Sequence, residues 1–175
     1  MNAENIKLIE PTVELKTEFL IMAKENIATG EYNKGPFDRA IENFEKYVQD
    51  RLDWKVGKSL PKGWIPATEF WLVRGQNELL GISSLRHKLT ENLRKIGGHI
   101  GYNIRPSERR KGYGTLILKF TLEKARELGL KRVLITCDDD NIASARIIEK
   151  NRGVLEDKIT NEEREVLKRR YWIEL

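Results

Sequence analysis

The sequence has little of what a disulfide, a metal site or a membrane segment requires. Cys137 is the only cysteine, and the 175 residues include two histidines. One cysteine cannot form an intramolecular disulfide, and so few sulfur and imidazole ligands argue against a zinc site. No run approaches the ~20 apolar residues that span a bilayer, and the N-terminus lacks the basic and apolar regions of a secretory signal. We therefore expect a cytoplasmic protein with no metal and no membrane partner.

The charged residues are numerous but mixed in sign. The 32 lysines and arginines stand among 27 aspartates and glutamates, which leaves a net charge of +5. A positive balance favours phosphate-bearing ligands or nucleic acid, whereas interspersed charges are typical of solvated helix faces. The basic runs Arg109–Lys111 and Lys168–Arg170 come with no nucleic-acid recognition motif. We expect no nucleic-acid partner, and a basic nucleic-acid-binding module remains an alternative.

The apolar pattern predicts one α/β domain over residues 1–175, since a chain of about this length forms a single core. Hairpins followed by a strand–helix–strand crossover predict a mixed, mostly antiparallel central sheet with helices on both faces. The expected strands are 5–10, Thr68–Val73, Leu79–Leu85, Gly98–Ile104, Arg132–Cys137, Val154–Ile159 and Arg169–Leu175. Arg132–Cys137 is almost wholly apolar, so we expect it to be central and covered on both faces.

Helices are predicted from apolar stripes and from their end signals. They begin at Pro11, at Gly35-Pro36, at Gly112 and at Asn141, and a turn is expected at 91–98. The predicted buried face of the first helix is Leu15, Phe19, Met22, Ala23 and Ile27, and that of the second is Phe37, Ile41, Phe44, Tyr47, Val48 and Leu52.

The segment Pro106–Thr115 carries the most informative chemistry. A strand ends, a basic turn with two glycines follows, and a helix begins. The first amides of a helix have no partner within the helix, and the helix dipole adds positive charge there. Gly112 and Gly114 remove side chains that would hold a ligand away from these amides. The segment therefore predicts a pyrophosphate site.

Two other phosphate motifs do not fit this segment. No Gly-Lys-Ser/Thr follows, as a Walker loop requires, and the third glycine of a dinucleotide fingerprint is missing. An ordinary turn with solvated basic side chains explains a lone Arg-x-x-Gly-x-Gly equally well. The surrounding strand, helix, buried strand and second helix favour the ligand site.

These residues resemble a known superfamily. Arg109-x-x-Gly112-x-Gly114 between a strand and a helix is similar to the acyl-coenzyme A signature of the Gcn5-related N-acetyltransferases (GNAT), and 97–153 matches continuously. The resemblance implies the acyl-CoA N-acyltransferase fold with acetyl-CoA as cosubstrate and no metal. It implies direct acetyl transfer in a ternary complex to a primary amine, on a small molecule or on a protein or peptide. Homodimers are frequent in the superfamily, so a homodimer is possible.

The resemblance also implies which residues bind the coenzyme. Amides of the signature loop would hold the pyrophosphate, and the preceding strand would line pantetheine through main-chain hydrogen bonds. One amide of that strand would polarise the thioester carbonyl. The implied residues are Asn103, Ile104, Arg105, Arg109, Arg110, Lys111, Gly112, Tyr113, Gly114, Thr115, Asn141 and Ser144. Asn141 is also a good helix N-cap.

The catalytic acid is where the sequence departs from the family. Ile148 occupies the position at which many members have the tyrosine that protonates the thiolate. Tyr113, Tyr171 and water are the candidates to replace this tyrosine. A protein that keeps the fold and binds coenzyme A but no longer catalyses a reaction is an alternative. Arg152 also stands where many relatives have glycine.

The base that accepts the proton of the amine has three candidates. His99 leads, because histidine titrates near neutral pH, and a hydrogen-bonded structural histidine is the competing interpretation. Glu69 and Asp138 are the others. Four aromatic residues in segments that cover the acceptor side of the family, Trp54, Trp64, Tyr32 and Phe37, fit either an apolar acceptor pocket or core packing.

Overall fold

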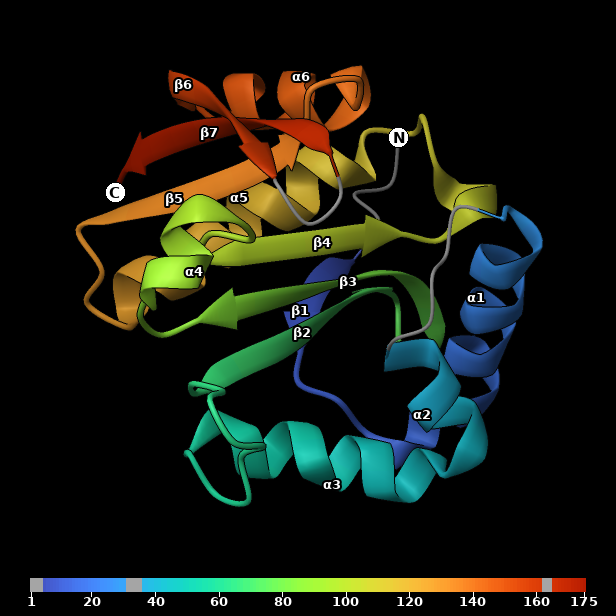
Figure 1. Ribbon diagram of the computed structural model, residues 1–175. Helices are drawn as coiled ribbons and strands as arrows, with labels where there is room; N and C mark the ends of the chain where they lie inside the picture. The colour runs from blue at the N-terminus through green and yellow to red at the C-terminus, as the bar shows by residue number, and fades with distance from the viewer. Residues whose placement is uncertain (1–4, 31–35, 162–164) are drawn as a thin grey trace.

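The computed structural model describes residues 5–30, 36–161 and 165–175 (Figure 1). The strands form two antiparallel sheets, one in the order β1-β2-β3-β4 and one in the order β5-β7-β6. Their bounds are β1 Ile6–Ile9, β2 Ala67–Arg74, β3 Glu78–Arg86, β4 Ile100–Ile104, β5 Arg132–Asp138, β6 Val154–Asn161 and β7 Val166–Glu174. The predicted α/β architecture with largely antiparallel strands is confirmed.

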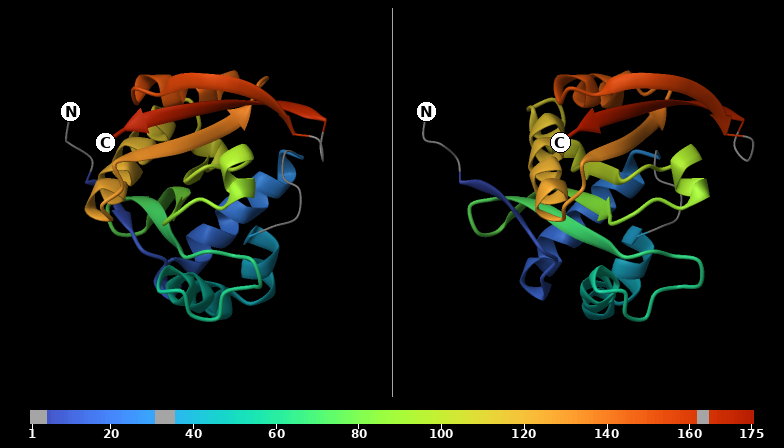
Figure 2. Two further views of the ribbon diagram at one scale, coloured as in Figure 1. Left: turned by 60° about the vertical axis from the view of Figure 1, so that its left-hand side comes forward. Right: turned by 90° about the vertical axis from the view of Figure 1, so that its left-hand side faces the viewer.

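Helices cover both faces of the four-stranded sheet. The helical elements are η1 Val13–Leu15, α1 Lys16–Ala28, α2 Pro36–Glu42, α3 Phe44–Lys55, α4 Glu91–Lys95, η2 Pro106–Glu108, α5 Tyr113–Glu127 and α6 Ile142–Lys150. Helices α1–α3 pack on one face through a core that includes Phe19, Phe44 and Trp71, and α5 packs Ile117 against Leu72 on the other. In both views of Figure 2, α2 and α3 lie at the opposite end of the molecule from the three-stranded sheet. No helix within the described ranges is long and apolar enough to cross a bilayer.

The helix predicted from Gly35-Pro36 onward is two helices. Gly35 lies outside the described residues, and Asn43 separates α2 from α3. Asn43 has an extended backbone, and its side chain accepts a hydrogen bond from the Lys46 amide at 2.9 Å. This is N-cap geometry, which starts a new helix axis. The turn leaves Ile41 49% exposed, so its predicted burial is wrong, as is that of Ile27 at 45%.

The segment predicted as a turn at 91–98 contains α4. Thr90 begins this helix, because its Oγ1 accepts a hydrogen bond from the Leu93 amide at 3.2 Å. The helix is five residues long, too short for an apolar stripe to show in the sequence. It stands beside β4 in Figure 1, where it forms one wall of a cleft described below.

The strand predicted as central lies at the edge of its sheet. Val133, Leu134 and Ile135 are buried, as expected, but within the described residues β5 forms a ladder with β7 alone. Its other side faces β4, where the His99 amide donates to the Leu134 carbonyl at 2.7 Å before the strands separate. We call the gap between β4 and β5 the fork. An apolar strand beside a fork has the same composition as one inside a sheet, because both are buried.

Candidate active site

The loop between β4 and α5 has the geometry expected of an anion site. The helical turn η2 ends at Glu108, and α5 begins at Tyr113. Between them Arg109 is extended, and Arg110 and Gly112 have φ values of 64° and 90°. The left-handed conformation at Gly112 turns the chain into the helix, so the segment is not continuous helix.

Five consecutive amides in this loop have no acceptor among the residues that the structure describes. The amides of Thr115 and Leu116 donate to the Gly112 carbonyl, and α5 has no side-chain cap. Within the described residues, no hydrogen bond engages the backbone N–H groups of 110–114. These donors stand at the N-terminus of a 15-residue helix, whose dipole adds positive charge. Such an array binds a phosphate or diphosphate group.

Glycine stands at the two loop positions for different structural reasons. A Cβ on Gly112 would meet no described atom within 4 Å, so Gly112 supplies the left-handed turn and an open approach to the amides. A Cβ on Gly114 would stand 2.5 Å from Ile147 Cδ1 of α6. Gly114 therefore lets α5 pack closely on α6, a role that the sequence analysis did not foresee, and its predicted role in clearing room for a ligand stays a prediction.

The fork exposes main-chain groups of β4. The Arg105 amide donates to Leu80 of β3 at 3.0 Å. Hydrogen-bonding directions alternate along an antiparallel strand, so the N–H and C=O groups of Tyr102 and Ile104 point away from β3 and into the fork. The Arg105 guanidinium forms ion pairs with Glu18 and Glu25 of α1. Of the three predicted pantetheine residues, Ile104 thus turns its main chain into the fork, where its carbonyl accepts a hydrogen bond from Arg109 Nε at 3.3 Å, while Arg105 ties the loop to α1.

The opposite side of the fork is the start of α6. Asn141 caps this helix by accepting a hydrogen bond from the Ser144 amide at 3.0 Å. Tyr102 reaches across the fork, and its hydroxyl lies 2.8 Å from Ser144 Oγ. Burial raises the pKa of Tyr102 to about 12, so the phenol is protonated at neutral pH. The fork therefore contains a pair of hydroxyl groups next to the free main chain of β4.

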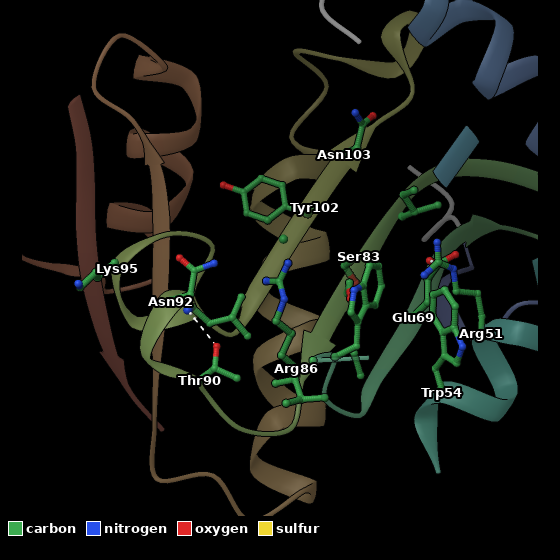
Figure 3. A pocket seen from close by; sticks show the side chains of 18 of the residues that line it. Arg51, Trp54, Glu69, Ser83, Arg86, Thr90, Asn92, Lys95, Tyr102 and Asn103 are labelled. Carbon is green, nitrogen blue, oxygen red and sulfur yellow. Dashed lines mark hydrogen bonds and ion pairs between the residues drawn. The ribbon is translucent and has the colours of Figure 1, made fainter. Parts of the chain in front are cut away.

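A cleft of about 890 Å³ opens beside the fork (Figure 3). The strand register places Glu69, Ser84 and Gly101 in one row across β2, β3 and β4, and these residues form part of the floor. Trp54 and Trp64 line the wall formed by α3 and the following loop, and α4 forms the other wall. Asn103 belongs to the lining, and its Oδ1 is buried with no hydrogen-bond partner among the described residues.

A family model decides the assignment. The acetyltransferase (GNAT) domain model matches residues 8–154, most of the chain. The chain belongs to the GNAT acetyltransferase family. A search of curated proteins found no match.

Solved structures of GNAT enzymes share the whole fold. A RimL ribosomal-protein α-N-acetyltransferase in complex with coenzyme A is 20% identical, with a TM-score of 0.75 over 99% of this chain and 96% of that one. The microcin C7 self-immunity acetyltransferase MccE, in complex with acetyl-CoA and AMP, is 19% identical, with a TM-score of 0.67 over 99% and 94%. The spermidine/spermine N-acetyltransferase SpeG from Vibrio cholerae is 14% identical, with a TM-score of 0.64 over 97% and 95%. The predicted acyl-CoA N-acyltransferase fold is confirmed.

Within this GNAT fold, His99 lies at the base of the fork. Its ring Nδ1 accepts a hydrogen bond from the Leu134 amide at 2.9 Å, and its own amide donates to the Leu134 carbonyl. Burial, with Arg94 and Arg86 nearby, lowers the pKa of His99 to about 4. The ring lines a separate cavity of about 300 Å³ with Trp172. These contacts favour a histidine that joins β4 to β5.

The other candidates for proton transfer are engaged elsewhere. The Tyr113 hydroxyl accepts a hydrogen bond from Arg74, and its ring packs with Leu72 on the far face of the sheet. Tyr171 donates to Glu149 at 3.1 Å, and Asp138 forms an ion pair with Lys168. None of the three lines the cleft, and Tyr102, which the sequence analysis did not consider, does.

Glu69 lines the cleft within a side-chain network. Its carboxylate accepts hydrogen bonds from Tyr47 Oη at 2.7 Å and Trp71 Nε1 at 2.9 Å, and forms an ion pair with Arg51 at 3.1 Å. The Arg51 guanidinium also stacks on Trp54, 4.6 Å from the ring centroid.

The four predicted aromatic residues divide between cleft and core. Trp54 and Trp64 pack with ring centroids 5.1 Å apart and line the cleft. Phe37 belongs to the core with Phe19, at a centroid separation of 5.7 Å. Tyr32 lies outside the described residues. The tryptophans therefore support the interpretation as a pocket wall, and Phe37 supports core packing.

Proposed function

We propose that this protein transfers an acetyl group from acetyl-CoA to a primary amine bound in the cleft. The observation that carries the proposal is the run of five amides at 110–114 that have no acceptor in the described parts of the chain, located where β4 and β5 separate. The amides suit the pyrophosphate, and the fork leads from them to the cleft. Acetyl-CoA would supply the activated thioester, and the chain's own residues would position it and manage two protons.

The residues present fit the coenzyme. The loop amides would bind the pyrophosphate, with Arg109, Arg110 and Lys111 adding positive charge. The main-chain groups of Tyr102 and the Ile104 amide, which face the fork, would pair with the pantetheine arm like an added strand. One of these amides would also stabilise the developing oxyanion, a contribution of about 3–4 kcal/mol by analogy with other oxyanion holes. Asn103 Oδ1 is an unpaired acceptor for a ligand N–H.

Tyr102 and Ser144 are the proposed donors to the leaving thiolate. Ile148 is fully buried and has no donor, whereas the Tyr102 hydroxyl lies inside the fork. A phenol with a pKa of about 12 keeps its proton and can donate it to a sulfur anion as the carbon–sulfur bond breaks. Ser144 would orient the phenol and relay the proton.

Glu69 is the proposed acceptor for the proton of the amine, through water. It lies two strands from β4, and strands are about 4.8 Å apart, so direct transfer is too far. Ser84 stands between Glu69 and Gly101 in the same row and lines the cleft. A water held at Ser84 would complete the path. His99, with a pKa of about 4 and a hydrogen bond to Leu134, is assigned a structural role.

The relatives do not identify the acceptor amine of this protein. RimL modifies a ribosomal protein and SpeG modifies polyamines, as their names state, so the fold accommodates unlike acceptors. A coenzyme-binding protein without activity is the second candidate, favoured by the missing tyrosine at Ile148. The two candidates differ in turnover, not in coenzyme binding.

Thermal denaturation with acetyl-CoA, followed by an assay of free thiol over an amine panel, tests the proposal. A ligand at 100 times its dissociation constant adds about 2.7 kcal/mol to the free energy of unfolding. Without a shift in melting temperature, coenzyme binding fails; with a shift but no thiol released above the hydrolysis rate, the protein is a passive binder. Tyr102→Phe should lower kcat about 100-fold, by loss of one general acid. Tyr171→Phe, which removes a buried hydroxyl outside the cleft, is the matched control.

A further inference from the structure

Arg86 rises from the floor of the cleft. It is the last residue of β3, and side chains alternate along a strand, so it lies on the same face as Ser84 and Ile82. Figure 3 shows its guanidinium between β3 and α4, pointing toward Tyr102. Burial lowers the pKa of Arg86, although arginine stays charged at neutral pH. A cation therefore stands partly desolvated inside the cleft.

Only part of this guanidinium is used by the protein. Nη1 donates to the carbonyls of Gly97 and Gly98, both at 3.0 Å. Arginine has five N–H donors, and Nε and Nη2, which carry the other three, have no partner among the described residues. Within the same ranges no carboxylate lies within ion-pair distance of Arg86. The unused donors include the forked edge that binds a carboxylate or phosphate with two parallel hydrogen bonds.

The other charges of the cleft are balanced. Arg51 is paired with Glu69 at 3.1 Å, and Lys95 lies 3.9 Å from Glu91. These two carboxylates are the acidic groups of the lining, so Arg86 is left as the uncompensated charge. A partly buried cation is costly unless an anion pairs with it. A bound anion would restore the balance, and a second cation, such as a polyamine, would add to the repulsion.

We propose that the acceptor is a small amine that also carries an acidic group, a carboxylate or a phosphate, and that Arg86 binds this group. The proposal rests on the proposed function, because it places the amine beside the fork. Within the acceptor molecule, the acidic group at Arg86 must then lie at some distance from the amine beside the fork. Ile82 pairs with Asn103 and lies four residues before Arg86, a distance of about 13 Å between Cα atoms at the usual strand rise, part of which the arginine side chain spans.

A length series of ω-amino acids tests the proposal. Glycine, β-alanine, 4-aminobutyrate and 6-aminohexanoate are each compared with their carboxamides, and phosphoethanolamine with ethanolamine, by thiol release from acetyl-CoA. For at least one length we expect kcat/KM to be about 10- to 100-fold higher for the acid, the value of a hydrogen-bonded charge pair. The phosphate pair distinguishes the two acidic groups. Ratios near one throughout, or faster turnover of spermidine, would overturn the proposal.

Substitutions at Arg86 separate recognition from structure. Arg86→Gln should reduce the acid-to-amide ratio to about one, and Arg86→Lys, which keeps the charge, should retain part of it. A merely structural Arg86, holding the carbonyls of Gly97 and Gly98, would lower turnover of both acceptors and leave the ratio unchanged, which contradicts the proposal. Lys95→Gln removes a cation of the same cleft that already has a partner, and it should keep the ratio.

The shift in melting temperature on adding acetyl-CoA distinguishes failure of the coenzyme site from failure of acid recognition by Arg86. If acetyl-CoA raises the melting temperature of the wild type and of Arg86→Gln equally, both proteins are folded and the acceptor ratio is a direct measure of the cleft. Loss of the ratio in Arg86→Gln then supports the proposal, and its persistence refutes it. Absence of the shift in the wild type refutes the coenzyme site instead.

Discussion

The proposed coenzyme end and the proposed acceptor end of this site are built from different groups. At the coenzyme end the ligand-facing groups are main-chain amides at 110–114 and the free edge of β4. At the acceptor end they are side chains that come from α3, three strands and α4. The first set is presented by one loop, and the second exists only after segments distant in the sequence have packed together.

This difference explains what each end can tolerate. A main-chain site depends on backbone conformation, so most side chains can change if the glycines stay. A side-chain site depends on each residue, and its ion pairs exist because desolvated charges need partners. The coenzyme end should therefore be sensitive at Gly112, and the acceptor end at Glu69 and Arg86.

The largest expected effect is on the network of the acceptor end. Glu69→Ala should lower the free energy of unfolding by about 3–5 kcal/mol, because it leaves the Arg51 charge unpaired in a partly buried site. Urea denaturation measures the change. Glu45→Ala, at an exposed ion pair with Lys16, is the control and should have no measurable effect. Equal losses of unfolding free energy in the two variants would show that the acceptor end is no more sensitive than an exposed ion pair.

His99, which joins β4 to β5 between the two ends of the site, should make the stability of the protein depend on pH. The pKa of His99 is about 4 in the folded protein, against about 6.5 when unfolded, so the unfolded chain binds more protons between these values. Stability from this group is complete above pH 6.5 and falls by about 3 kcal/mol as the pH drops to 4. His99→Asn places an amide oxygen where Nδ1 accepts from Leu134 and does not titrate. Denaturation across pH 4–7 should be flatter for this variant, and an unchanged slope would contradict the assignment.

Gly112 and Gly129 form a matched pair at the two ends of α5. Their φ values are 90° and 86°, and a Cβ on either would meet no described atom within 4 Å. Alanine at each should cost about 1–2 kcal/mol of stability, from the left-handed backbone alone. Affinity for acetyl-CoA, measured by calorimetry, should fall about 10-fold in Gly112→Ala only, because that methyl group stands beside the amides. A similar fall in Gly129→Ala would mean that the loss is not local.

The smallest effect concerns a position remote from both ends. Arg152 follows α6 with a φ of 68°, a conformation that glycine adopts without strain. Arg152→Gly should stabilise the protein by about 1 kcal/mol, or a few degrees in melting temperature. Arg146→Gly, at an exposed site inside the same helix, should destabilise it by about 1 kcal/mol. Destabilisation in both variants would show that the left-handed residue carries no strain.

The helices and strands were predictable where neighbouring residues alone specify them. Two apolar runs on either side of a turn located β2 and β3 within a residue or two, and glycines marked both ends of α5. The break at Asn43 was missed, because its capping role depends on a side-chain conformation rather than on residue type. Tyr102 and Arg86 were missed as site residues, because a tyrosine and an arginine in strands usually serve the core and the surface.

The sequence by itself determined where the proposed coenzyme end begins. A helix that starts at Gly112 leaves its first amides without partners inside the helix, and this follows from a few consecutive residues. Tertiary structure decided the rest: that Gly114 serves the packing of α5 on α6, that His99 joins two strands, and that Arg86 faces the cleft with no acidic partner among the described residues. Burial and pairing depend on contacts between distant segments, so they are properties of the fold that no short stretch of sequence contains.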